Sequence, residues 1–160
     1  MRRVLKAGTV LLLAIAVLAS TQAGAQLADK KVLTLAAAKK MAMAAEAEAA
    51  KNNWRVVIAI VDDGGHLLYL QRTDETQIGS IDIAIGKATT SVALKRPSKA
   101  VEDIIAGGRN ALLGVKGITP LQGGLPIMVD NKLVGAIGVS GVTSQQDEQV
   151  AKAGIEALGH

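Results

Sequence analysis

The stretch Val61-Asp62-Asp63-Gly64-Gly65-His66 reverses the chain sharply and decides how it folds. An apolar run rich in Val and Ile, Arg55 to Val61, leads into it, and a second strand-like segment, His66 to Arg72, follows it. Asp-Gly and Gly-Gly pairs tolerate the positive φ angles that tight hairpin turns need. We therefore expect a β-hairpin that turns at residues 62–65, with His66 at its corner.

Two more glycine-rich segments predict the other half of a sheet. They are Gly123-Gly124-Leu125-Pro126-Ile127 and Val134-Gly135-Ala136-Ile137-Gly138-Val139-Ser140-Gly141. The segment Leu125 to Val129 predicts one strand, Asp130-Asn131 predicts a tight turn, and Lys132 to Val139 predicts the partner strand.

These glycines do not form a phosphate-binding motif, because no Gly-Lys-Ser/Thr element follows them. Ser140 also lies outside the Gly-x-Ser-x-Gly pattern of serine hydrolases. Glycine instead permits close approach of helix to strand, or of subunit to subunit. We expect the glycine corners both to pack closely and to enclose a cavity for a flat or acidic ligand.

Helical periodicity predicts three helices before the second pair of strands, and the third of them is short. Thr34 is expected to cap an alanine-rich helix from Leu35 to Lys51, and a second helix is expected from Ser80 to Leu94. Pro97 ends that helix, and Ser98 is expected to cap a short helix to Ala106.

The rest of the chain completes the domain. Residues 107–110 predict a loop and residues 111–124 an extended or irregular segment. Ser144 is expected to cap a last helix to Leu158, with Asp147 completing a pattern like a capping box. Strands joined by short turns pair antiparallel. The sequence therefore predicts a single α+β domain with a central antiparallel sheet flanked by helices.

Residues 1–25 have the pattern of a secretory signal peptide. A basic start, Met1 to Lys6, precedes an apolar run from Val10 to Ala19, and Ala23-Gly24-Ala25 supplies small residues at a cleavage site before Gln26. The apolar run is shorter than the roughly 20 residues of a spanning helix, so no stable membrane anchor is expected, although an uncleaved anchor is the alternative. We therefore expect a periplasmic or secreted protein.

Composition narrows the function of the remaining domain. Removing 25 of the 160 residues leaves 135, and removing Arg2, Arg3 and Lys6 lowers the net charge from +4 to +1. With one Trp, one Tyr and no Phe, such a domain lacks both the basic field and the stacking rings of a nucleic-acid binder. It also has no Cys, so aliphatic packing and subunit association must replace disulfides.

Several ordered segments identify a family resemblance. They are Val61-Asp62-Asp63-Gly64-Gly65-His66-Leu67, Gln71-Arg72-Thr73-Asp74, Ser80-Ile81-Asp82-Ile83-Ala84 with Lys87-Ala88, Gly123-Gly124-Leu125-Pro126, Gly135 to Gly141, and Gln146-Asp147-Glu148 with Val150-Ala151. Together these segments resemble the GlcG/HbpS family, also called the haem-degrading family, from about Leu33 to Leu158. They are also similar to the C-terminal domain of PduO-type cobalamin adenosyltransferases.

The resemblance implies a profilin-like fold for residues 26–160 and assembly into homo-oligomers such as octamers. It also implies haem as a cofactor in some members, and in secreted members a link to haem sequestration and to redox sensing beside a sensor kinase. Thr73 stands where the family often has Met, and residues 107–119 are the least alike. Members of the family differ in this region, which lines their pocket. The resemblance therefore specifies the fold better than the ligand.

His66 is the first candidate site residue, as a cofactor-binding and metal-binding side chain. A neutral imidazole is a good axial ligand for haem iron. The alternative is a turn residue whose ring is solvated. His160 is terminal, and neither histidine belongs to a spaced metal-binding motif. Met41, Met43 and Met128 are soft ligands in principle, with Met41 expected in the core.

Arg72 and Lys87 are the other candidate cofactor-binding residues. The guanidinium fork of Arg72 suits a carboxylate such as a haem propionate, and Lys87 would add a second positive charge. The alternative for both is a solvated face. Lys87 has no helical ion-pair partner at the favoured spacing, because Asp82 is five residues away.

Two functions of different classes follow. The first, which we favour, is a secreted haem-binding protein that sequesters or senses haem without turnover, with no catalytic residue. The second is an accessory protein or enzyme for a small organic acid, as the glycolate-linked membership of the family implies, with an anion pocket around Arg72 and Lys87. Haem degradation is a third possibility that rests on the name of the family.

Overall fold

The computed structural model describes residues 28–159. The chain divides into two units, residues 1–30 and 31–160, and every helix and strand described below belongs to the second. The predicted signal peptide, residues 1–25, lies outside the described residues. Within the described range, no helix is both long and apolar enough to cross a membrane.

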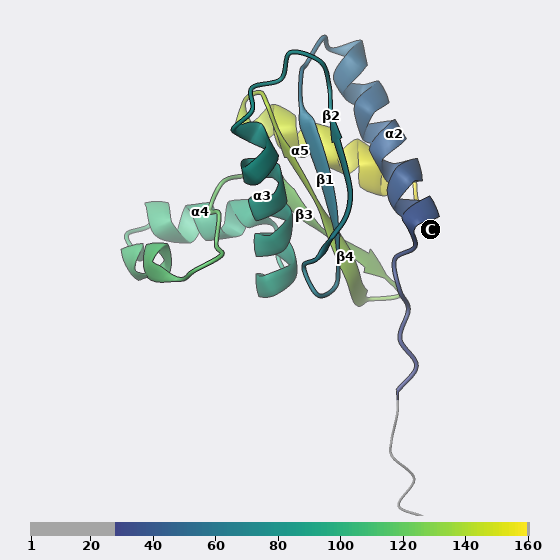
Figure 1. Ribbon diagram of the computed structural model, residues 1–160. Helices are drawn as coiled ribbons and strands as arrows, with labels where there is room; N and C mark the ends of the chain where they lie inside the picture. The colour runs from purple at the N-terminus through teal and green to yellow at the C-terminus, as the bar shows by residue number, and fades with distance from the viewer. Residues whose placement is uncertain (1–27, 160) are drawn as a thin grey trace, which may run out of the picture. The chain divides into compact units, whose positions relative to one another are not determined.

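Four strands form one antiparallel sheet in the order β2-β1-β4-β3 (Figure 1). They are β1 (Val57–Asp62), β2 (Leu67–Arg72), β3 (Gly124–Val129) and β4 (Lys132–Ser140). The two predicted hairpins, β1–β2 and β3–β4, are therefore confirmed, and the pairing of β1 with β4 joins them. The predicted α+β domain with a central antiparallel sheet is confirmed as well.

Helices cover both faces of the sheet (Figure 1). On one face, α2 (Leu35–Lys51) and α5 (Ser144–Glu156) bury Met41 and Val150 against Ile58 of β1 in the main core. On the other face, α3 (Ser80–Leu94) packs its small side chains against β1 and β4. The buried alanines of α2 lie in the core of this chain.

Local signals set the start of α2 and the turn of the first hairpin, as predicted. The Thr34 hydroxyl accepts a hydrogen bond from the N–H of Ala37 at 3.2 Å and so caps α2. In the β1–β2 turn, the Asp62 carboxylate accepts the backbone N–H groups of Gly64 and His66, each at 2.9 Å. Gly65 has a φ of 81°, which explains why glycine stands there.

Glycines close the packing of α3 on the sheet. A Cβ atom at Gly138 would lie 2.1 Å from the carbonyl oxygen of Ala84, and one at Gly124 would lie 2.2 Å from that of Lys87. Helix and strands thus touch through backbone atoms. The expected close helix-to-strand approach is confirmed, and at Gly124 and Gly138 helix backbone fills the space in which a cavity was expected.

Two predicted caps lie one residue away from the real ones. The capping residue of α5 is Thr143, which forms a capping box with Gln146. Asp147 takes no part in that box. At α4 (Ser98–Ala106) the capping residue is Pro97, and the Ser98 hydroxyl instead donates to the carbonyl of Leu121 at 2.6 Å. At α5, Thr143 and Ser144 are adjacent and both residue types suit the capping position, so the sequence alone does not separate them.

The segment after α4 differs from the prediction in one respect. Residues expected to be extended or irregular contain a short 3-10 helix, η1 (Asn110–Gly114). Figure 1 shows α4 and the segment after it standing out beside α3, away from the sheet. Three large apolar side chains on this segment are exposed: Leu113, Val115 and Leu121.

Candidate ligand-binding site

Lys87 points into the protein from α3. Its side chain is only 3% exposed, and its ammonium group donates to Asp147 Oδ2 at 2.7 Å and to the carbonyl of Val139 at 2.9 Å. A charged group is buried only when such partners replace its water. Lys87 is therefore a link between α3, β4 and α5. It is not on a solvated face, and it presents no free charge to a ligand.

Asp147 completes this buried Lys87–Asp147 pair. Its second oxygen, Oδ1, accepts the backbone N–H of Val142 at 3.2 Å, so both carboxylate oxygens have partners. Burial raises the pKa of Asp147 above the ordinary value of an aspartate, although the hydrogen bond and the charge of Lys87 act in the opposite direction.

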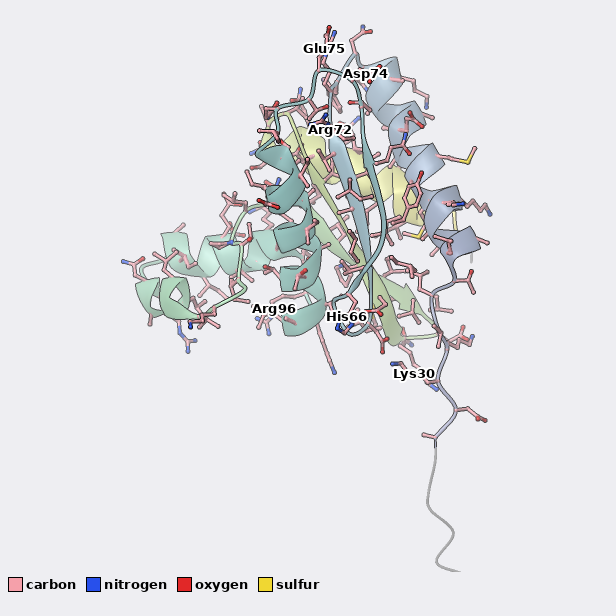
Figure 2. All side chains as sticks on the ribbon, viewed as in Figure 1. Lys30, His66, Arg72, Asp74, Glu75 and Arg96 are labelled. Carbon is pink, nitrogen blue, oxygen red and sulfur yellow. The ribbon has the colours of Figure 1, made fainter. Side chains whose placement is uncertain are left out.

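Arg72 ends β2 with an exposed side chain. His66 immediately precedes the same strand, so the two residues lie at opposite ends of β2 (Figure 2). Six residues of strand separate them by roughly 20 Å. The structure therefore does not bring His66, Arg72 and Lys87 together in one protomer.

His66 is exposed at the β1–β2 corner, and its side chain has 84% of its surface in solvent. Its Nδ1 lies 3.5 Å from Asp62 Oδ1, and its ring lies over Gly64, where a Cβ atom would come within 2.8 Å of Nδ1. The two hydrogen bonds from backbone N–H groups, that of His66 first, hold the pKa of Asp62 below its ordinary value. A carboxylate beside Nδ1 leaves Nε2 as the nitrogen for an external ligand.

A surface hollow of about 430 Å³ lies beside this corner, and we call it the hairpin-end hollow. It is lined by Asp63, Lys95, Met128, Asn131, Lys132 and Leu133. The lining comes from the β1–β2 turn, the end of α3 and the β3–β4 hairpin. The hollow therefore gathers two lysines, one carboxylate, one amide, a thioether and an apolar side chain on the His66 side of the sheet.

Two of these lining residues owe their positions to left-handed backbone. Lys95 follows the last residue of α3 and has a φ of 50°. In the β3–β4 turn, Asp130 has a φ of 48° and Asn131 a φ of 59°. Positive φ at both turn residues gives the tight hairpin that matches the strand twist. The Asp130-Asn131 pair signalled this turn, but Lys95 carried no sequence signal for its position at a helix end.

The methionines fall in different places. Met41 is fully buried in the core, as expected. Met43 is exposed on α2, and Met128, half exposed, lines the hairpin-end hollow. Among residues 28–159 no group of three or more His, Asp or Glu side chains is arranged to hold a metal ion.

The helix-covered antiparallel sheet defines a small α+β domain, and its hairpin histidine is exposed. The chain belongs to the family described as haem degrading protein HbpS-like, which matches residues 33–156. Among its relatives is protein GlcG of Escherichia coli K12, 43% identical over 111 residues, or 69% of this chain and 83% of GlcG. The predicted family is thereby confirmed.

Solved structures share this fold. A double mutant of HbpS from Streptomyces reticuli is 36% identical, with a TM-score of 0.80 over 86% of this chain and 94% of that one. The PduOC:haem complex is 26% identical, with a TM-score of 0.75 over 81% of this chain and 96% of that one. The predicted similarity to the C-terminal domain of PduO is confirmed.

Proposed function

We propose that the protein binds haem and acts as a secreted or periplasmic protein that sequesters or senses it. The observation that carries this proposal is the PduOC:haem complex, because a domain of the same fold and family holds haem there. The signal-like pattern of residues 1–25 supports export.

The residues of the hairpin end fit a haem group. His66 offers an exposed imidazole whose Nδ1 faces Asp62, so Nε2 would be the nitrogen available to hold the haem iron. Lys95 and Lys132 line the adjacent hollow and would pair with the two propionates. Met128 and Leu133 would cover the apolar faces of the ring. Haem itself would supply redox-active iron.

A haem titration of the purified protein tests this proposal. We expect a Soret band that saturates with added haem, and a shift and weakening of that band in His66→Ala. Gly64→Ala keeps the imidazole but displaces its ring, so it should also disturb the band. Lys95→Ala and Lys132→Ala should weaken binding, whereas Lys99→Ala, on an exposed lysine of α4, serves as the control.

Two results would contradict this assignment. Unsaturable haem uptake would remove the binding function, and an unchanged spectrum in His66→Ala would remove the axial role of His66. Progressive loss of the Soret band with a reductant and dioxygen would favour haem degradation over sequestration or sensing.

The same hollow also supports the second candidate function, binding of a small organic acid. Two lysines can hold a carboxylate without any haem. Thermal unfolding in the presence of glycolate discriminates the two, since a ligand that binds the folded state raises the midpoint. A rise with glycolate that Lys95→Ala and Lys132→Ala abolish, together with no Soret band, would favour the acid.

We also propose that the protein is a homo-oligomer. A cysteine-free domain of this size needs other sources of stability, and the segment after α4 exposes Leu113, Val115 and Leu121. In an oligomer, Arg72 of one subunit would be free to approach the hairpin end of another, so its predicted role in ligand binding stays open to test.

A further inference from the structure

A second hollow, of about 370 Å³, lies at the end of the sheet opposite His66. It is lined by Glu46, Ala50, Asn53, Trp54, Arg55, Thr73 and Asp74. These residues come from the end of α2, the link to β1 and the loop after β2. We call it the Trp54 hollow. Figure 2 shows Asp74 and Glu75 at this end of the domain, next to the end of α2.

Trp54 gives this hollow an aromatic wall. It is the only Trp in the chain, and it packs against the main core while remaining partly exposed. Packing against the core holds the ring in place, and Trp54 also lines the hollow, so part of its indole is accessible to a ligand there. The face of a Trp ring attracts cations more strongly than that of Tyr or Phe.

The charges around this ring are unbalanced. Arg55 forms an ion pair with Glu75, a residue held in left-handed backbone at a φ of 61°. This conformation is uncommon for a side chain such as Glu. The pair neutralises the one cation of the hollow. Glu46 and Asp74 also line it, and neither side chain has an ion pair or hydrogen bond with a described residue.

We propose that the Trp54 hollow binds a small organic ammonium ion. The indole face would contact the cation, and the carboxylates of Glu46 and Asp74 would supply the opposite charge. A divalent metal fits less well, because among residues 28–159 no three His, Asp or Glu side chains are grouped to hold one, and the Thr73 hydroxyl that also lines the hollow is already hydrogen-bonded to Val56. This site is independent of haem binding, since it lies at the other end of β2.

Trp54 itself reports on binding, because the fluorescence of the purified protein comes from this single Trp. Titration with tetramethylammonium chloride should give a saturable change in Trp emission. Sodium chloride at equal ionic strength should give only a small change that does not saturate. If the two salts produce the same response, or if glucose saturates the signal and tetramethylammonium does not, the proposal is overturned.

Charge-neutralising variants sharpen this test. Glu46→Gln and Asp74→Asn should each raise the dissociation constant for tetramethylammonium at least threefold, and the double variant should raise it further. Glu156→Gln, which removes a carboxylate from the end of α5, should bind as the parent protein does. Equal affinity in the double variant and the parent would overturn the role of the two carboxylates.

The aromatic contribution is tested by calorimetry, since replacing Trp54 removes the optical signal. Trp54→Phe should retain weakened binding, and Trp54→Leu should lose it, with folding of both variants checked by circular dichroism. Unchanged heat of binding in a folded Trp54→Leu variant would remove the aromatic wall from the proposal. His66→Ala should leave tetramethylammonium binding intact, so failure of this site and failure of the haem site are distinguishable.

Discussion

At the scale of single residues, Lys87 takes its partners from segments far along the chain. Its ammonium group reaches Val139 on β4 and Asp147 on α5, and it lies among the small buried residues of α3. Breaking a buried ion pair by removing one member leaves the other charged without compensation. The pair is therefore costly to break singly and less costly to remove whole.

Lys87→Met tests this asymmetry. We expect a loss of about 3–5 kcal/mol in the free energy of unfolding, measured by urea denaturation, because Asp147 stays buried without its cation. The double variant Lys87→Met/Asp147→Leu should recover most of that loss. Lys99→Met, which breaks an exposed pair with Asp103, should have little effect. Equal losses in the single and double variants would contradict the argument.

Gly138 offers a second test at this scale. A methyl group there would lie 2.1 Å from the carbonyl oxygen of Ala84 and 2.6 Å from the nitrogen of Ala88. Backbone cannot yield as a side chain does, so we expect Gly138→Ala to lose about 3 kcal/mol in the free energy of unfolding. Gly79→Ala is the control, because its Cβ meets nothing within 4 Å. Similar stability of the two variants would show that α3 can shift.

At the scale of elements, the start of α5 depends on Thr143. Its hydroxyl accepts the N–H of Gln146, whose side chain accepts the N–H of Thr143 in return. Thr143→Ala should cost about 1 kcal/mol in thermal unfolding, the usual cost of losing such a cap. Ser144→Ala should cost almost nothing. A larger loss of stability in Ser144→Ala than in Thr143→Ala would show that Ser144 is the capping residue.

The β1–β2 turn should make stability depend on pH. The hydrogen bonds to Asp62 lower its pKa in the folded state, so the folded turn is stabilised above the unfolded-state pKa of about 4. That stabilisation is lost as the pH falls through the lower, folded-state pKa.

Urea denaturation at pH 6 and pH 3 measures this effect. Asp62→Asn cannot ionise, so the difference in unfolding free energy between the two pH values should be smaller than in the parent protein. Asp82→Asn removes an exposed carboxylate that accepts no hydrogen bond from a described residue, and it should keep the parent's difference. If Asp62→Asn keeps the parent's difference in unfolding free energy between pH 6 and pH 3, the turn is not the source of the pH dependence.

Sequence patterns predicted those elements whose signals are local. Thr34 before α2, the Asp62 to Gly65 turn and Pro97 after α3 act within a few residues, and each is confirmed. The Lys87–Asp147 pair escaped prediction because 60 positions separate its members. One signal was present: Lys87 lies on the same helix stripe as Ala84 and Ala88, where a charged residue implies a buried partner.

The candidate site was harder to predict than the fold. The hairpin-end hollow combines Asp63, Lys95 and Met128 from segments whose meeting depends on the strand order. His66 is a candidate in the sequence because its turn is a local motif, and its role stays a prediction. Arg72 was grouped with it by proximity in sequence, yet an extended strand carries its two ends apart.

At the scale of the whole molecule, self-association is open to direct measurement. We expect native mass spectrometry to show a homo-oligomer, held partly through Leu113, Val115 and Leu121. Leu113→Glu should then lower the mass, because burying an unpaired carboxylate is unfavourable. Val32→Glu, at another exposed apolar residue, is the control. A monomer in the parent protein would refute the expectation.

The central pairing of β1 with β4 also governs when the protein can fold. Residues 57–62 pair with residues 135–140, so a growing polypeptide that ends before β4 has only the β1–β2 hairpin as paired strands and lacks both β4 and α5. A lone hairpin is at best marginally stable in water. Synthesis must therefore be almost finished before any lasting tertiary structure exists, and a ribosome-bound fragment that stops short of β4 should be digested by protease as readily as an unfolded peptide.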